Sequence, residues 1–115
     1  ILLALMASGL EGQRFAFHGY LPAKAKERAL AIRELEKESA RKRQTQIFIE
    51  TPYRNPALFA DLLRLADSAT RLCVAVHLTA PDESIATATI AEWRKRPPPD
   101  FKRRPAVFLL LSDGV

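Results

Sequence analysis

Residues 46–56 read QIFIETPYRNP, and the predicted fold is built around this stretch. It begins as an apolar, β-branched and aromatic run typical of a strand, and a carboxylate and a guanidinium follow at Glu50 and Arg54. Asn55 and Pro56 predict a helix start, because the Asn55 side-chain oxygen can cap free backbone N–H groups and Pro56 fits the first turn. We therefore expect Glu50 to Arg54 to form a short connection at the carboxyl end of a buried strand, where open α/β sheets bind ligands.

The side chains of this connection make it a candidate site. Glu50 can orient a donor, Tyr53 can stack or form a hydrogen bond, and Arg54 can hold an anion with its planar guanidinium group. We predict Glu50 and Arg54 as catalytic residues, and Tyr53 together with Arg54 as substrate-binding residues. A structural interpretation stays open, in which Glu50 pairs with Arg54 and the prolines stiffen a turn that positions the following helix.

Strand and helix patterns alternate on both sides of this stretch. Helices are predicted at residues 23–44 and 56–67, and alternating threonines favour a strand at residues 84–90, followed by a short helix through Trp93. The predicted strands lie near residues 15–21, 45–50, 70–79, 84–90 and 106–112. Too little chain joins the last two strands for a long crossover helix, so some pairing must be antiparallel. The predicted fold is α/β, with a mixed five-stranded sheet flanked by helices.

Composition indicates one domain and an intracellular setting. The chain has 115 residues, 48% of them hydrophobic, which suits a single modest core, and its net charge of +5 allows an anionic partner without requiring one. Cys73 is the only cysteine and lies in an apolar run, so we predict a buried core residue and no internal disulfide. No apolar run reaches the roughly 18 residues of a membrane span and no signal peptide is recognisable. We expect a cytoplasmic protein without a membrane contact.

The first ten residues indicate that the chain is part of a larger protein. Residues 1–10 are almost entirely apolar, follow a helical pattern and end near Gly9, a plausible helix stop. Because no polar residues shield this helix, we expect the chain to be the second part of a longer protein and the helix to be covered.

The histidines and the proline-rich loop support weaker hypotheses. His18 and His77 both fall within predicted strands and have no ligand partner at metal-binding spacing, so we predict structural roles and no metal site. Residues 97–99 are three prolines between two basic clusters, RKR at 94–96 and KRR at 102–104. An RNA-binding surface around this stiff loop is one alternative function.

Four motifs resemble a known family. They read LALMASGL at residues 3–10, FAFHGYLP at 15–22, ETPYR at 50–54 and HLT at 77–79. In this order they resemble the C-terminal half of the tetrapyrrole (corrin/porphyrin) methylase superfamily, and within it the ribosomal RNA small-subunit methyltransferase I branch. The resemblance covers nearly all of the chain.

This resemblance implies an S-adenosylmethionine-dependent methyltransferase. Such enzymes have two α/β domains with the cofactor in the cleft between them, so residues 1–115 would be the C-terminal domain and the N-terminal cofactor-loop domain would be absent. The fragment alone would then be inactive, and the implied partners are its own N-terminal domain and a second copy in a homodimer. The implied cofactor-binding residues are Ser8, Leu10, Gly19, Thr51 and Thr79.

The acceptor is less clearly indicated than the reaction. The RNA-modifying branch commonly has His where this chain has Tyr53, and the Lys, Arg and Gly of its next motif are replaced here. The basic clusters favour ribosomal RNA as the acceptor, with a tetrapyrrole (corrin/porphyrin) substrate as the alternative. A non-catalytic binding or dimerisation module is the other alternative, since no complete catalytic set is present.

Overall fold

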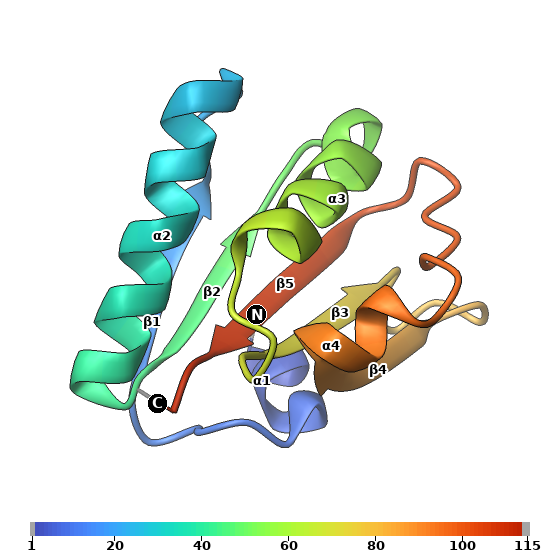
Figure 1. Ribbon diagram of the computed structural model, residues 1–115. Coiled ribbons are helices and arrows are strands. Elements are labelled where there is room, and N and C mark those ends of the chain that lie inside the picture. The colour runs from blue at the N-terminus through green and yellow to red at the C-terminus, as the bar shows by residue number, and fades with distance from the viewer. Residues whose placement is uncertain (1, 114–115) are drawn as a thin grey trace.

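The computed structural model describes residues 2–113 as a five-stranded mixed sheet with helices on both faces (Figure 1). This confirms the predicted α/β fold. The elements in chain order are α1 (Leu2–Ser8), β1 (Phe15–Tyr20), α2 (Ala25–Lys42), β2 (Thr45–Ile49), the 3₁₀ helix η1 (Pro52–Arg54), α3 (Asn55–Leu65), β3 (Arg71–Val76), β4 (Ser84–Thr89), α4 (Ile90–Arg94) and β5 (Ala106–Leu111). All five predicted strands are present, including β4, where alternating threonines outweighed the helical alternative.

The strand order is β1-β2-β5-β3-β4, with β5 in the centre. β1 and β2 are parallel, and β5 is antiparallel to both of its neighbours, β2 and β3. Strands β1, β2 and β3 therefore run in the same direction, and we call the end of the sheet where they finish its carboxyl end. The loops that follow these three strands meet there.

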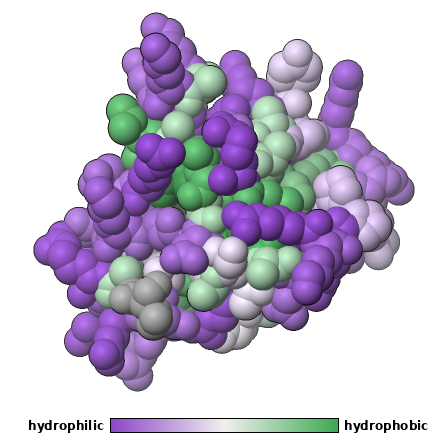
Figure 2. Space-filling model, in the orientation of Figure 1, coloured by the Kyte–Doolittle hydropathy of each residue, from purple (hydrophilic) through white to green (hydrophobic). Residues whose placement is uncertain are grey.

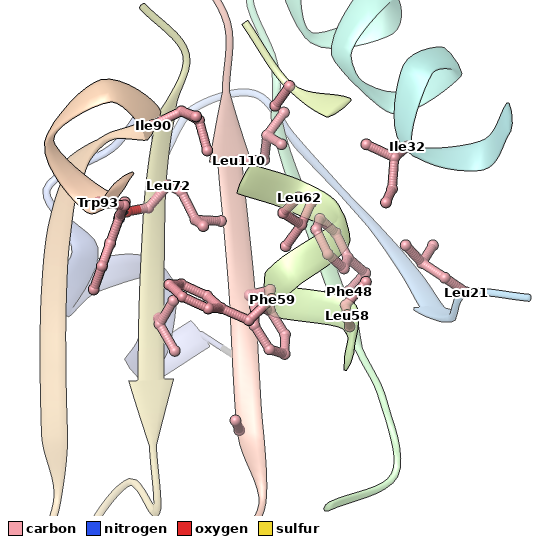
Figure 3. Packing of buried hydrophobic residues seen from close by; sticks show 14 of the residues in the cluster. Leu21, Ile32, Phe48, Leu58, Phe59, Leu62, Leu72, Ile90, Trp93 and Leu110 are labelled. Carbon is pink, nitrogen blue, oxygen red and sulfur yellow. The ribbon is translucent and has the colours of Figure 1, made fainter. Parts of the chain in front are cut away.

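Alternation along the strands divides the core into two layers. In β3, Leu72 and Val74 point toward α2, α3 and α4, whereas Cys73 and Ala75 point toward α1. The larger layer has an aromatic centre, which includes a T-shaped contact of Phe59 with Trp93 at 5.4 Å between ring centroids (Figure 3). Cys73 is fully buried, as predicted.

Helix α1 covers only part of its face of the sheet. It packs on β3, β4 and β5 through Ala4 and Leu5, and Gly9, with φ of 72°, follows its end in the predicted stop position. Leu3 and Met6 remain 57% and 79% exposed. Large hydrophobic side chains are also exposed on strand β1, at Phe15, Phe17 and Tyr20. The predicted exposed apolar surface of this helix is therefore present on one side of it, at Leu3 and Met6. Ile1 lies outside the described residues.

The opposite face is mostly hydrophilic. Figure 2 shows hydrophilic residues around a hydrophobic area on the side of the molecule that carries α2 and α3. On α2, Glu38 and Lys42 form an ion pair, with 3.0 Å between Oε2 and Nζ. No helix in the described part of the chain is long and apolar enough to cross a membrane.

Candidate functional site

The loop after β2 holds Glu50 in a fixed position at the carboxyl end of the sheet. The Glu50 side chain is 2% exposed, and its Oε1 accepts a hydrogen bond from the Thr51 backbone N–H at 2.7 Å. The Arg54 guanidinium lies 3.6 Å from the same oxygen and donates to Thr51 Oγ1 at 3.2 Å. The short helix η1 brings Arg54 back toward Glu50, so the predicted pair is real. This geometry alone suits both the catalytic and the structural interpretation.

The second carboxylate oxygen of Glu50 distinguishes this loop from an ordinary turn. Glu50 Oε2 is buried and has no hydrogen-bond partner among residues 2–113. A buried oxygen without a donor destabilises a fold unless something else satisfies it. The carboxylate can therefore accept a hydrogen bond from a hydroxyl or amino group that enters this end of the sheet.

The role predicted for Asn55 is wrong. Asn55 has helical dihedral angles, φ −53° and ψ −45°, and its side chain does not cap the helix. Its Nδ2 instead donates to the Arg104 backbone carbonyl at 3.0 Å, because η1 already provides the first turn before α3. Pro56 does occupy the first turn of α3, as predicted.

The loop after β3 lies at the same end of the sheet. Strand β3 ends at Val76 rather than at Thr79, because His77 and Thr79 adopt left-handed φ values of 54° and 67°. His77 is therefore outside the strand, and it also has a partner, since its Nδ1 lies 2.8 Å from Asp82 Oδ1. Sequence spacing missed this contact because a tight turn brings the two residues together.

Arg104 joins the two loops. Its backbone carbonyl accepts from Asn55 after β2, and its guanidinium forms an ion pair with Asp82 after β3. Desolvation raises the pKa of Asp82, but the hydrogen bond with His77 and the charge of Arg104 outweigh it, so the pKa lies below its usual value. The carboxyl end of the sheet is thus one connected structure.

The five residues that resemblance assigns to the cofactor fall into two groups. Gly19, Thr51 and Thr79 lie at the carboxyl ends of β1, β2 and β3. Ser8 is buried at the end of α1, where its hydroxyl donates to the Leu5 carbonyl at 2.7 Å. Leu10 is buried beside the opposite end of the sheet, in a pocket shared with the first residue of β3. Only the first three therefore lie at the same end of the sheet.

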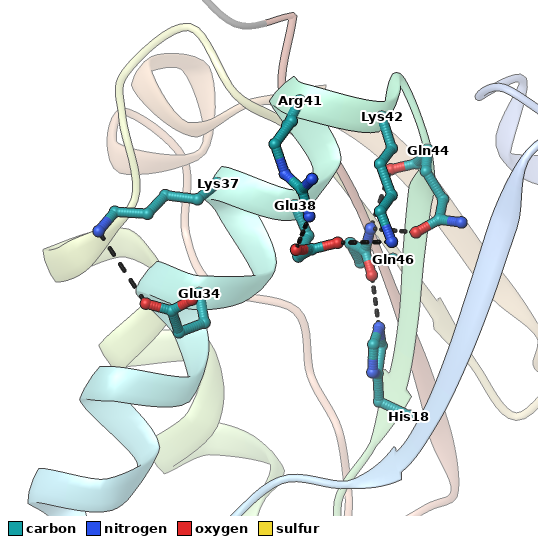
Figure 4. Close-up of polar contacts among 8 residues, drawn as sticks. All are labelled: His18, Glu34, Lys37, Glu38, Arg41, Lys42, Gln44 and Gln46. Atoms are coloured by element: carbon teal, nitrogen blue, oxygen red, sulfur yellow. Dashed lines mark hydrogen bonds and ion pairs between the residues drawn. The ribbon is translucent and has the colours of Figure 1, made fainter.

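The remaining polar groups make structural contacts. His18 forms a hydrogen bond with Gln46 on the neighbouring strand, which confirms its predicted structural role (Figure 4). Within residues 2–113, no group of three or more His, Cys, Asp or Glu side chains could hold a metal ion.

Sequence reasoning missed a groove next to the candidate loop. Tyr53, predicted to bind substrate, is 76% exposed and lines this groove together with α3, α4 and the proline-rich loop. The signal was present in the two basic clusters around residues 97–99. The sequence did not indicate that Tyr53 lines the same groove as these clusters.

The chain was compared with protein families, curated proteins and solved structures. No family model matches it. It is 33% identical over 114 residues to ribosomal RNA small subunit methyltransferase I of Vibrio cholerae, covering 99% of this chain and 38% of that protein. The protein of the same name from Escherichia coli O157:H7 is 32% identical, with 98% of this chain and 38% of that protein covered. The chain therefore spans about two-fifths of the length of these relatives.

Solved structures share the fold at lower identity. The methyltransferase CobJ gives a TM-score of 0.58 at 20% identity, covering 96% of this chain and 47% of that one. Uroporphyrin-III C-methyltransferase from Thermus thermophilus, in complex with S-adenosyl homocysteine, gives 0.51 at 21% identity, covering 97% and 49%. These likenesses establish the arrangement of strands and helices.

Proposed function

We propose that the chain belongs to the tetrapyrrole methylase superfamily and is the C-terminal domain of an S-adenosylmethionine-dependent methyltransferase acting on ribosomal RNA. The chain is homologous to part of ribosomal RNA small subunit methyltransferase I, and it shares the fold of the methyltransferase CobJ and of uroporphyrin-III C-methyltransferase. The observation that carries this proposal is 33% identity over 99% of the chain. Since the chain spans 38% of that relative, the activity is proposed for the longer protein, with an N-terminal domain supplying the glycine-rich cofactor loop.

The carboxyl end of the sheet fits one side of a cofactor site. S-adenosylmethionine supplies an electrophilic methyl group when bound. Glu50 Oε2 is buried and lacks a donor among the described residues, so it suits a hydroxyl or amino group of a ligand. A Cβ at Gly19 would meet nothing within 4 Å, so the space beside that backbone is open. Thr51 and Thr79 add hydroxyl groups after β2 and β3, the strands on either side of β5.

Glu50 and Arg54 are proposed to act on the acceptor. Methyl transfer needs the donor and acceptor in line and, for a hydroxyl or nitrogen acceptor, a group that removes the proton. Glu50 can accept that proton or orient the group that loses it, and Arg54 can hold a phosphate or carboxylate of the acceptor in a bidentate contact. Tyr53, exposed beside them, is proposed to contact the acceptor.

The exposed hydrophobic residues on α1 and β1 support two proposed partners. We assign this face to contacts with the N-terminal domain and with a second copy in a homodimer, because large exposed apolar patches commonly mark protein interfaces. A cytoplasmic location is proposed from the single buried Cys73, which suits a reducing compartment.

Methyl transfer by the full-length enzyme tests the function. Purified enzyme, labelled S-adenosylmethionine and unmethylated small ribosomal subunits should yield labelled RNA. Label in a uroporphyrin-type substrate and none in RNA would instead establish the tetrapyrrole alternative. If neither acceptor is labelled and calorimetry detects no cofactor binding, the chain is part of a binding module and the proposal fails.

A further inference from the structure

A groove of about 670 Å³ lies between α3, α4 and the loop that leads to β5. This volume falls within the usual range for small-ligand sites, roughly 300–1,000 Å³. Its floor is hydrophobic, because the lining residues Phe59, Trp93 and Phe101 are buried in the core. Figure 3 shows Phe59 and Trp93 there. Trp93 is also fixed by a hydrogen bond from its indole N–H to the Leu72 carbonyl at 2.8 Å. The groove therefore exists without a ligand.

The groove lining carries exposed cations that the fold uses little or not at all. Arg103 is exposed and has no ion pair or hydrogen bond among the described residues. Lys102 meets Asp100 only at 3.7 Å, and Arg96 lies over the Trp93 ring at 5.3 Å from its centroid. With Arg94, four cations line the groove against one carboxylate, Asp100.

A neighbouring arginine shows the contrast. Arg94 also lines the groove, but it donates to the Leu63 and Ala66 carbonyls and to Ser68 Oγ at 2.8–3.0 Å. Its guanidinium ties α4 to α3 and is fully used. Lys102 and Arg103 instead adopt left-handed φ values of 46° and 56°, which L-residues rarely adopt. They project from a loop whose preceding prolines limit its conformations.

The lining of the groove also includes an exposed aromatic ring. Tyr53 is 76% exposed, comes from the short helix η1 and lines the groove beside Pro52 and Pro56. An exposed planar ring and exposed cations around one apolar floor match a ligand that has both a planar apolar face and negative charge. A nucleotide has both, whereas an acidic peptide offers charge without the planar face.

We propose that this groove binds an unpaired nucleotide of an RNA strand, with the base against Tyr53 and the flanking phosphates on Lys102 and Arg103. The assignment rests on the proposed function, because it identifies how the RNA acceptor is held next to the Glu50 loop. Stacking on an aromatic ring tolerates any base, so the groove supplies affinity and position rather than sequence recognition.

Binding of a fluorescent, unstructured ten-nucleotide RNA to the purified protein, followed by anisotropy, tests the groove. Tyr53→Ala should weaken binding roughly 5- to 150-fold, the span of losing one stacked base, whereas Tyr53→Phe should stay within about twofold. Lys102→Gln with Arg103→Gln should reduce the slope of log affinity against log salt by about 1.4, for two lost phosphate contacts. The matched control, Lys26→Gln with Arg33→Gln, removes two charges from α2 that do not line the groove, and it should leave the affinity and the salt slope close to those of the parent protein.

Three results would overturn the proposal. These are unchanged affinity in both groove variants, displacement of the RNA by an acidic peptide of equal charge, and a free mononucleotide that binds as tightly as the oligonucleotide. Methylation is measured separately with ribosomal subunits. If the enzyme methylates RNA but its groove variants bind RNA normally, the groove is not the RNA-binding site, and the proposed function is unaffected.

Discussion

Arg54 can act on an acceptor or only on its own loop, because its guanidinium contacts both Glu50 and Thr51. In the full-length enzyme, Arg54→Ala should lower methylation about ten- to a thousandfold, equivalent to roughly 1.4–4 kcal/mol of lost positioning or electrostatic stabilisation. Affinity for S-adenosylmethionine, measured by calorimetry, should be unchanged.

A control separates catalysis from folding. Arg64→Ala removes an exposed arginine of α3 that pairs with Asp61, and it should leave methylation unchanged. Because Arg54→Ala also leaves the buried Glu50 carboxylate without its cation, thermal unfolding of both variants must be compared. Normal methylation by a folded Arg54→Ala enzyme would assign the arginine to the structural interpretation.

Cys73 should be chemically silent in the folded chain. It is fully buried, and burial raises the pKa of its thiol, so little thiolate exists at pH 8 and reagents cannot reach it. A thiol-specific chromogenic reagent should react only at the rate of unfolding, and at once in denaturant. Fast reaction under native conditions would contradict the packing of α1 over this part of the sheet.

Contacts of single residues were predicted well within one short loop. They were predicted poorly where a tight turn or tertiary folding supplies the partner. The left-handed turn after β3 brings Asp82 to His77, and no spacing rule reports such a contact. Asn55 was assigned to a cap because the cap rule is local, whereas its real partner, the Arg104 carbonyl, lies 49 positions away. The Glu50–Arg54 pair was predictable because both residues belong to one short loop.

Helix α4 has only five residues and depends on its first turn. The Thr89 side chain accepts from the Glu92 N–H, and the Glu92 carboxylate accepts from the Thr89 N–H in return, a reciprocal capping box. The backbone hydrogen bond from Thr89 is the main reason that the pKa of Glu92 lies below its usual value of 4.5. This helix carries Trp93 into the core.

The pH dependence of this cap has a definite sign. A folded pKa below the unfolded one means that Glu92 stabilises the fold above pH 4.5 and loses this contribution as pH falls through the folded pKa. Glu92→Gln should therefore unfold more readily than the parent near pH 7, in urea titrations, and equally near pH 3. A difference that persists at pH 3 would assign the effect to something other than the carboxylate charge.

Helices α2 and α3 are joined by a nearly buried ion pair. Arg28 Nη2 lies 2.7 Å from Asp61 Oδ2, and both side chains are at least 85% shielded. Asp61→Leu should cost about 3–5 kcal/mol of unfolding free energy, because it leaves the Arg28 charge buried without a partner. Adding Arg28→Met should restore most of this loss in denaturant titrations. A double variant as unstable as the single one would show that packing rather than charge is responsible.

Elements were predictable to the extent that their pattern was self-contained. The alternating threonines of β4 and the broad apolar face of α3 each indicated the correct element without tertiary information. The groove beside α3 was not predicted because its walls come from η1, α3, α4 and the loop before β5, four segments that meet only through the core.

Part of one face of the sheet, on the α1 side, keeps large hydrophobic side chains exposed among the described residues. Met6→Glu with Phe17→Glu should reduce self-association of the protein, because charged side chains would replace exposed apolar ones on the α1 side of the sheet. Leu30→Glu is the matched control, since Leu30 is 63% exposed on α2, on the other face. Sedimentation should give a lower mass for the double variant than for the control. Equal masses for both would exclude this face as the interface between copies.

The mixed sheet could be predicted from the length of the segment between β4 and β5, but the strand order could not. The short link between β4 and β5 excluded an all-parallel sheet. The strands that are buried on both faces take the inner positions of the sheet. Because β2, β3 and β5 have similar apolar sequences, the sequence does not show which of them lies in the centre.

The central position of β5 has a consequence for synthesis on the ribosome. β5 is the last of the five strands to be made, yet it alone joins the β1–β2 pair to the β3–β4 pair. Until it emerges, the nascent chain consists of two separate halves with open strand edges, the state in which chaperones and proteases act. Ribosome-bound chains stopped before residue 106 should therefore be cleaved rapidly by added protease, and chains extended far enough for residue 113 to leave the exit tunnel should resist it.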